Sequence, residues 1–250
     1  MSKETTHFGY QTIPTHTKTS RVAEVFQSVA EKYDLMNDLM SFGLHRFWKR
    51  LCIAKASIQP ADQVLDLAGG TGDLSLLATK KLNDKGHIVL ADINAAMIQQ
   101  SREKLVNKGI VKAVSWLQTN AEHLPFPDHA FDKILIGFGL RNVTHKERAL
   151  TEMCRVLKPG GRAVILEFSQ LNSTKLSKWY DTYSFHVLPK LGKLICNDSD
   201  SYQYLAESIR KHPDQETLKS MLLTAGFHHA EYQNIQGGLV ALHLGFKHVS

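Results

Sequence analysis

The chain has 250 residues, of which 43% are hydrophobic and 22% charged, enough for one globular domain with a large buried core. This composition excludes disorder over most of the length, and no apolar run approaches the roughly 20 residues that a membrane-spanning helix needs. The formal net charge of +6 favours an anionic partner, although a solvated basic surface explains it equally well. Three cysteines without pairing or metal-ligand spacing, and a polar start without an apolar leader, predict a cytoplasmic protein with no metal site.

The first 56 residues are predicted to divide in two. Residues 1–19 are polar and predict a flexible N-terminus, whereas residues 20–56 carry apolar side chains at helical spacing. We interpret 20–56 as a helical segment that caps the substrate, because segments outside a cofactor fold often determine which acceptor is used. The same spacing is also typical of an ordinary core helix, and this alternative stays open.

Residues 57–250 are predicted to form one α/β domain. Predicted strands at 64–67, 88–91, 114–117, 131–137 and 163–168 alternate with helical runs that include 95–108 and 146–157, the arrangement of a parallel sheet. A further helix at 214–225 precedes strands at 230–235 and 239–246, and Gly237-Gly238 between them predicts a hairpin. The prediction is a Rossmann-like, doubly wound, mostly parallel sheet that ends in an antiparallel edge hairpin. Residues 169–212 exceed what one crossover needs and predict a helical, substrate-binding insertion.

A glycine-rich loop follows the first predicted strand, in the sequence VLDLAGGTGD at 64–73. Glycines let a backbone turn sharply and approach a ligand closely, so Asp66, Gly70 and Gly72 are predicted to lie at a cofactor. Asp92 ends the next strand, where an acid can accept hydrogen bonds from both hydroxyls of a ribose. The alternative to a cofactor-binding loop is a tight connection between a strand and a helix that binds no ligand.

The loop favours S-adenosylmethionine over a dinucleotide. The third glycine of the G-x-G-x-x-G pattern is missing, and acids on both sides of the loop, Asp66 and Asp73, would repel a pyrophosphate. S-adenosylmethionine offers a ribose to Asp92 and a sulfonium in place of phosphates. Asn120, after the third predicted strand, is placed to contact the adenine edge.

The order of these segments resembles the class I S-adenosylmethionine-dependent methyltransferases. Four motifs make the resemblance closer: Tyr33-Asp34-Leu35-Met36-Asn37, Gly137-Phe138-Gly139-Leu140-Arg141-Asn142-Val143, Arg155-Val156-Leu157-Lys158-Pro159-Gly160-Gly161 and Glu167-Phe168-Ser169. With them the chain is similar, over nearly its whole length, to the ubiquinone/menaquinone biosynthesis C-methyltransferases. The resemblance implies that Thr71, Asp92, Asn120 and Ala121 contact S-adenosylmethionine, and that Gly137, where the family commonly has serine, lies beside it.

The resemblance also implies a reaction, the C-methylation of a polyprenylated benzoquinol or naphthoquinol ring in menaquinone or ubiquinone biosynthesis. Arg141 and Asn142 are the predicted catalytic residues, because they follow the fourth strand at the edge where open α/β sheets bind ligands. A guanidinium is always protonated, so Arg141 would act electrostatically while a carboxylate, His186 or His145 takes the proton. The alternative for Arg141 is a surface ion pair with Glu147.

The partner predictions follow from the same residues. Met and aromatic residues of the two segments outside the sheet suit an isoprenoid tail, and basic residues at 45–50 interleave with Phe47 and Trp48, which favours peripheral contact with an anionic inner membrane. A homodimer and an assembly of quinone-synthesis enzymes are left open. No nucleic acid is expected, since Asn-Pro-Pro-Tyr and Pro-Cys motifs are missing after the fourth strand. The rival functions are methylation of another small molecule or of RNA, and a non-catalytic cofactor-binding scaffold.

Overall fold

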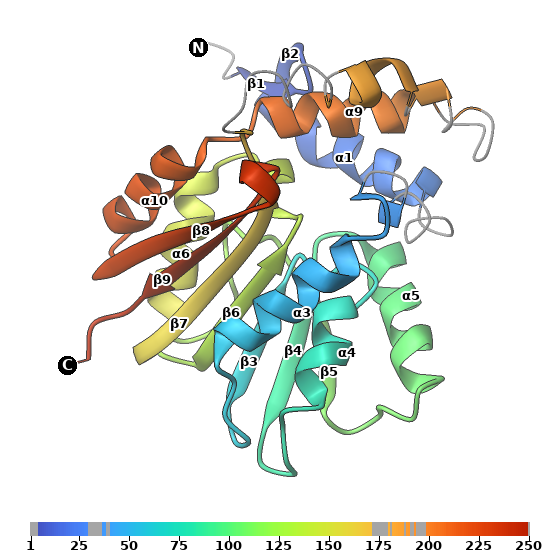
Figure 1. The fold of residues 1–250 in the computed structure, drawn as a ribbon. Helices are drawn as coiled ribbons and strands as arrows, with labels where there is room; N and C mark the ends of the chain where they lie inside the picture. The colour runs from blue at the N-terminus through green and yellow to red at the C-terminus, as the bar shows by residue number, and fades with distance from the viewer. Residues whose placement is uncertain are drawn as a thin grey trace.

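A seven-stranded sheet forms the centre of the molecule (Figure 1). The computed structural model describes residues 5–29, 37–38, 41–171, 180, 182–187, 189–190, 193 and 199–249. The strand order is β5-β4-β3-β6-β7-β9-β8. The parallel strands are β3 (Gln63–Leu67), β4 (His87–Asp92), β5 (Val114–Gln118), β6 (Phe131–Gly137) and β7 (Leu157–Phe168). The antiparallel edge hairpin is β8 (His229–Ile235) and β9 (Val240–Phe246), joined by a 3₁₀ turn at Gln236–Gly238, and the predicted fold class is therefore confirmed.

Helices cover both faces of the sheet, as the doubly wound prediction requires. One face is covered by α3 (His45–Ala56), α4 (Asp73–Thr79) and α5 (Ala95–Val106), and the other by α6 (Lys146–Val156) and α10 (Gln215–Thr224). Successive side chains of a strand point to opposite faces. Val64 accordingly packs into the core beneath α3, while Leu65 packs into the second core beneath α6 and α10. The predicted alternation of strands and helices thus produces two separate hydrophobic cores.

The N-terminal residues are more ordered than the sequence predicts. Residues 5–19, expected to be flexible, form the hairpin of β1 (Thr5–Phe8) and β2 (Gln11–Pro14) and the start of α1 (Thr15–Val29). The ring of Phe8 stacks on Tyr204 of α9 (Ser199–Arg210) with 4.2 Å between ring centroids. Two short strands of polar sequence have no local signal of stability, and it is this contact with a helix almost 200 residues away that holds them.

The residues of the predicted helical cap, 20–56, lie in two different parts of the fold. Trp48 and Cys52 of α3 are fully buried, and α3 packs against β7 as part of the helical layer. By contrast, α1 lies beyond the carboxyl ends of the strands, next to α9 (Figure 1). The motif at 33–36 lies outside the described residues, and so do 172–179, 181, 188, 191–192 and 194–198 of the predicted insertion. Its described part is helical, with a π turn at Tyr183–Val187 and α9.

Strand β7 begins earlier than predicted. The sequence predicts a strand at 163–168 and a helix that ends at 157, but β7 already begins at Leu157 and α6 ends at Val156. Leu157 pairs with Phe131, whereas Arg162 pairs with Lys133, so the register shifts between these two pairs. Gly160 has φ +72°, a conformation that glycine adopts without strain, and it allows the irregularity inside the strand.

Candidate functional site

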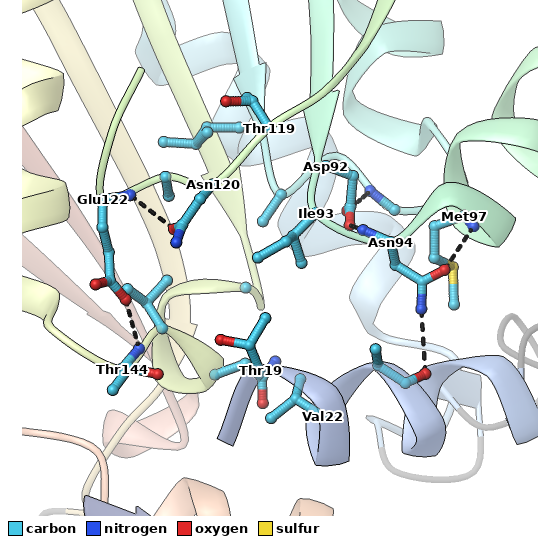
Figure 2. A pocket seen from close by; sticks show the side chains of 18 of the residues that line it. Thr19, Val22, Asp92, Ile93, Asn94, Met97, Thr119, Asn120, Glu122 and Thr144 are labelled. Atoms are coloured by element: carbon cyan, nitrogen blue, oxygen red, sulfur yellow. Dashed lines mark hydrogen bonds between the residues drawn. The ribbon is translucent and has the colours of Figure 1, made fainter. Parts of the chain in front are cut away.

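A pocket lies between the carboxyl ends of β3, β4 and β6 on one side and α1 on the other (Figure 2). Thr19, Val22 and Ala23 of α1 form one wall. The side-chain Nδ2 of Asn94 donates to the backbone carbonyl of Ala23 over 3.2 Å, which joins α1 to the loop after β4. Of the predicted site residues, five line this pocket: Gly70, Asp92, Asn120, Ala121 and Asn142.

The glycine loop brings its backbone to the pocket at Gly70. Gly70 has φ +53°, and a Cβ added there would meet no atom within 4 Å, so the position opens onto space rather than onto packed protein. Gly72 has a different role, because a Cβ there would lie 3.0 Å from the Leu105 side chain. It adopts φ +82° and precedes α4 at the N-cap. The loop therefore combines one glycine exposed to a ligand with one required for packing of α4 against α5.

Asp92 is fixed by two backbone amides. Its Oδ2 accepts from the Gly70 N–H and its Oδ1 from the Asn94 N–H, both over 2.9 Å. Burial raises the pKa of this carboxyl, while the two amide bonds favour its charged form. Each oxygen of a carboxylate has more than one acceptor site, so both can still accept from a ligand. A ribose has two vicinal hydroxyls, which can donate hydrogen bonds to the remaining acceptor sites of the two carboxylate oxygens.

The residues after β5 suit an adenine. The Oδ1 of Asn120 accepts from the Glu122 N–H over 2.9 Å, and its Nδ2 has no protein partner among the described residues. This leaves an amide donor facing the pocket, where adenine presents ring-nitrogen acceptors. Ile93 and Met97 add apolar surface to the same wall. The pocket residues thus fit an adenosine-containing ligand on the evidence of their donors and acceptors.

The two predicted catalytic residues occupy different environments. Both belong to the 3₁₀ turn Leu140–Asn142, but only Asn142 lines the pocket. The Arg141 guanidinium is buried, lies 2.7 Å from the Glu167 carboxylate, and also donates to the Phe138 carbonyl. Both side chains of this ion pair are 1% exposed. The partner is therefore Glu167 at the end of β7, and the alternative of a surface pair with Glu147 is wrong.

The remaining predicted cofactor residues lie behind the pocket wall. Asp66 is fully buried, Thr71 is 6% exposed, and a Cβ at Gly137 would meet Leu74 of α4 at 2.9 Å. Together with Gly72 they shape the loop and its packing rather than line the pocket. The pocket has lining residues that the sequence argument missed, chiefly those of α1. Asn94, which caps α5 through Ala96 and Met97, could have been found from its place just before a helix.

The charge argument against a pyrophosphate is also changed by the fold. Asp73 lies between two lysines, with its Oδ2 2.6 Å from Lys49 Nζ and its Oδ1 2.7 Å from Lys104 Nζ. These two lysines belong to α3 and α5, so the sequence around Asp73 does not predict that they pair with it. The carboxylate is neutralised within the fold, and the specificity for an uncharged ligand end must come from the pocket residues themselves.

The buried carboxyl of Asp66 should make the free energy of unfolding depend on pH in an unusual direction. Burial raises the pKa of this carboxyl to about 6, although Ser75 donates to its Oδ2 from both backbone and hydroxyl. Because the folded state holds the proton more tightly than the unfolded state, this group lowers the free energy of unfolding as pH rises from about 4 to 6, by on the order of 3 kcal/mol. Asp66→Asn is expected to remove this dependence.

The measurement is urea unfolding of both proteins without cofactor between pH 4 and 8. At pH 8 the Asp66→Asn variant should exceed the wild type in free energy of unfolding by about 2 kcal/mol. Equal pH dependence in the two proteins would contradict a buried, protonation-sensitive carboxyl at this position.

Solved structures share this architecture. A methyltransferase from Aquifex aeolicus, described as SAM-dependent, superposes with a TM-score of 0.63 over 88% of this chain and 97% of that one, at 17% identity. The [4+2]-cyclase SpnF superposes with a TM-score of 0.65 over 93% and 97%, at 14% identity. At such identities the likeness concerns the fold alone, and SpnF illustrates that one fold hosts different chemistries.

The fold and the adenosine-fitting pocket define a class I S-adenosylmethionine-dependent methyltransferase. Residues 14–247 match the model of the ubiE/COQ5 methyltransferase family, and the chain belongs to that family. It is 61% identical over 245 residues to a protein of Yersinia enterocolitica named ubiquinone/menaquinone biosynthesis C-methyltransferase UbiE, with 98% of each chain covered. A protein of the same name from Yersinia pestis is 60% identical with the same coverage.

Proposed function

We propose that this protein methylates a ring carbon of a polyprenylated quinol in ubiquinone or menaquinone biosynthesis. The observation that carries the proposal is the identity of about 60% over nearly the full length to C-methyltransferases named for this role. The pocket supports it, because its carboxylate and amide groups suit S-adenosylmethionine and it lies at the carboxyl ends of the strands.

The site residues divide by role in this proposal. Asp92 holds the ribose, Asn120 and the backbone at Ala121 contact the adenine, and Gly70 lets the loop approach the ligand. The residues behind the wall hold this loop in place: Asp66, Thr71, Gly72 and Gly137. S-adenosylmethionine supplies an electrophilic methyl group when it is bound.

The acceptor must be activated by loss of a phenolic proton. A free phenol has a pKa near 10 on the tyrosine reference, so a base must take this proton as the ring carbon attacks. The new carbon–carbon bond forms as the carbon–sulfur bond breaks, and the sulfur keeps the electron pair. The ring then loses the hydrogen of the attacked carbon as a proton and becomes aromatic again, and its oxygen regains the phenolic proton from the base, so that one proton is released overall. In this proposal Asn142, in the pocket wall, donates to the ring oxygen, and Arg141, whose charge is paired with Glu167, contributes only through the field of that ion pair.

The test is methyl transfer from labelled S-adenosylmethionine to chemically reduced demethylmenaquinone and to its benzoquinol counterpart, followed by mass spectrometry. A carbon-methylated product on either quinol supports the proposal. Bound cofactor without product on either quinol would direct attention to other small acceptors and then to RNA.

Peripheral membrane contact is proposed for one surface, the 42–50 patch. Phe42 and Phe47 are 57% and 56% exposed, and Leu44 between them is 37% exposed. Arg46 and Arg50 are exposed beside these apolar side chains. The Phe42 ring lies 4.8 Å from that of Tyr183, so the patch adjoins the insertion. None of the described helices is both long and apolar enough to cross a bilayer.

The double substitution Phe42→Ser and Phe47→Ser is expected to lower binding to vesicles containing phosphatidylglycerol at least about tenfold, because each buried phenylalanine contributes on the order of 2 kcal/mol. Flotation at low and high salt measures this. Val111→Ser serves as the matched control, since Val111 is 62% exposed on the loop before β5. Wild-type protein that fails to float, or a double variant that floats as well as the wild type, would contradict the proposed membrane contact.

Neither a homodimer nor an assembly with other enzymes of quinone synthesis is required by this proposal.

A further inference from the structure

The oxygen and the nitrogen of the Asn142 carboxamide lie in different surroundings. The Oδ1 accepts a hydrogen bond from the Tyr204 hydroxyl over 3.0 Å. The Nδ2 makes no hydrogen bond to any residue that the structure describes, and Asn142 lines the pocket. A carboxamide whose oxygen is bound to a fixed donor has its nitrogen turned the other way. The pair therefore presents an N–H donor toward the bound ligand.

The surroundings of Tyr204 keep its hydroxyl protonated, so that it can donate a hydrogen bond. Its side chain comes from α9 and is 4% exposed. Burial raises the pKa of this phenol, so it stays protonated at every pH at which the protein works. The ring is held by the stack against Phe8, whose planes differ by 19°. The orientation of Asn142 thus depends on two segments, β1 and α9, that both lie outside the sheet.

Asn142 lines the same pocket as the proposed cofactor contacts but lies on a different loop. Those proposed contacts, Asp92 and Asn120, lie at the ends of β4 and β5. Asn142 belongs to the turn after β6, beside the buried guanidinium of Arg141. A donor in this second loop is useful to a reaction in which an acceptor oxygen gains negative charge.

We propose that Tyr204 is a positioning residue, which orients Asn142 so that its Nδ2 donates to the ring oxygen next to the carbon that is methylated. This inference rests on the proposed function and deepens it. It adds a condition on the substrate, because an aromatic ring without an oxygen beside the reacting carbon leaves the donor unpaired. In the occupied pocket, a donor that is shielded from water and left without a partner disfavours such a ring.

Tyr204→Phe tests the inference because it removes the hydroxyl and keeps the stacked ring. A neutral hydrogen bond of about 0.5–1.5 kcal/mol corresponds to a loss of about 3- to 10-fold in kcat/KM for the quinol. The Kd for S-adenosylmethionine, measured by calorimetry, should stay within about twofold of the wild type. Tyr232→Phe, which removes a phenol hydroxyl from the edge strand β8, is the matched control and should leave kcat/KM unchanged.

A double-mutant cycle separates positioning from a general structural effect. If Tyr204 acts through Asn142, Tyr204→Phe causes no further loss when Asn142→Ala is already present. Equal losses in both backgrounds would overturn the inference, and so would a rise in the cofactor Kd that accounts for the loss.

A further variant keeps the question answerable even if Tyr204→Phe folds poorly. Asn142→Asp preserves an acceptor for Tyr204 but replaces the Nδ2 donor by an oxygen, so it should lose at least as much activity as Asn142→Ala. Activity close to that of the wild type would contradict the proposed donor. Wild-type protein that methylates neither quinol would overturn the proposed function as well, whereas methylation insensitive to Tyr204→Phe overturns this inference alone.

Discussion

Asp92→Ala is expected to weaken S-adenosylmethionine binding at least about 100-fold. A hydrogen bond to a charged group contributes on the order of 1.5–3 kcal/mol, and the proposed role of Asp92 includes a hydrogen bond from each ribose hydroxyl. The same carboxylate also accepts from the Gly70 and Asn94 amides, so its removal loosens the glycine loop and the start of α5 together. Isothermal titration of the purified protein with S-adenosylmethionine measures the loss.

Two further variants make this result specific. Asp92→Asn has nearly the same shape, but its amide nitrogen would face the N–H of Gly70 or of Asn94, so it should lose most of the affinity as well. Asp84→Ala removes an acid exposed on the loop before β4 and should bind as the wild type does. Affinity retained within about threefold by Asp92→Ala would show that the ribose is held elsewhere.

The part of the site that could be predicted is the part built from strand ends. Asp92 and Asn120 each follow a β-rich run, and in a parallel sheet the carboxyl ends of neighbouring strands meet at one edge. Their proximity therefore follows from the order of the elements along the chain. The same argument placed Asn142 after β6, where the pocket contains it.

The parts that could not be predicted depend on contacts between distant segments. The helical periodicity of α1 marks an apolar face but not the pocket edge that this face covers. The partner of Arg141 lies 26 residues away, at the end of β7. A search for charged partners close in the sequence instead points to Glu147, because local spacing carries no information about which strand ends adjoin a turn. The hydrogen bond of Asn142 to α9 escaped prediction for the same reason.

Glu167→Gln is expected to lower the free energy of unfolding by about 3–5 kcal/mol. Removing one partner of a buried ion pair leaves the other charge unpaired in a medium of low polarity. The Glu167 carboxylate accepts from the Arg141 guanidinium and backbone, and its Oε1 also accepts from the Phe168 N–H over 2.9 Å. All these groups are nearly inaccessible to water, so no solvent replaces the lost charge. Urea unfolding followed by circular dichroism measures the change.

An exposed pair provides the matched control. Lys219 and Glu216 lie 3.2 Å apart on α10, with the Glu216 side chain 64% exposed, so Glu216→Gln should change stability by less than about 1 kcal/mol. If Glu167→Gln changes it as little, the buried pair is not an important stabilising contact.

The double variant Arg141→Met with Glu167→Leu separates stability from chemistry. Replacing both charges by apolar side chains removes the unpaired charge and should recover most of the stability lost by either single change. The ion pair beside Asn142 is then missing while the fold is intact. Methyl transfer should therefore remain about 3- to 10-fold below the wild type, since the field of a neutral ion pair on a developing oxyanion is of the order of a neutral hydrogen bond. A double variant that regains both stability and methyl transfer would assign Arg141 a purely structural part.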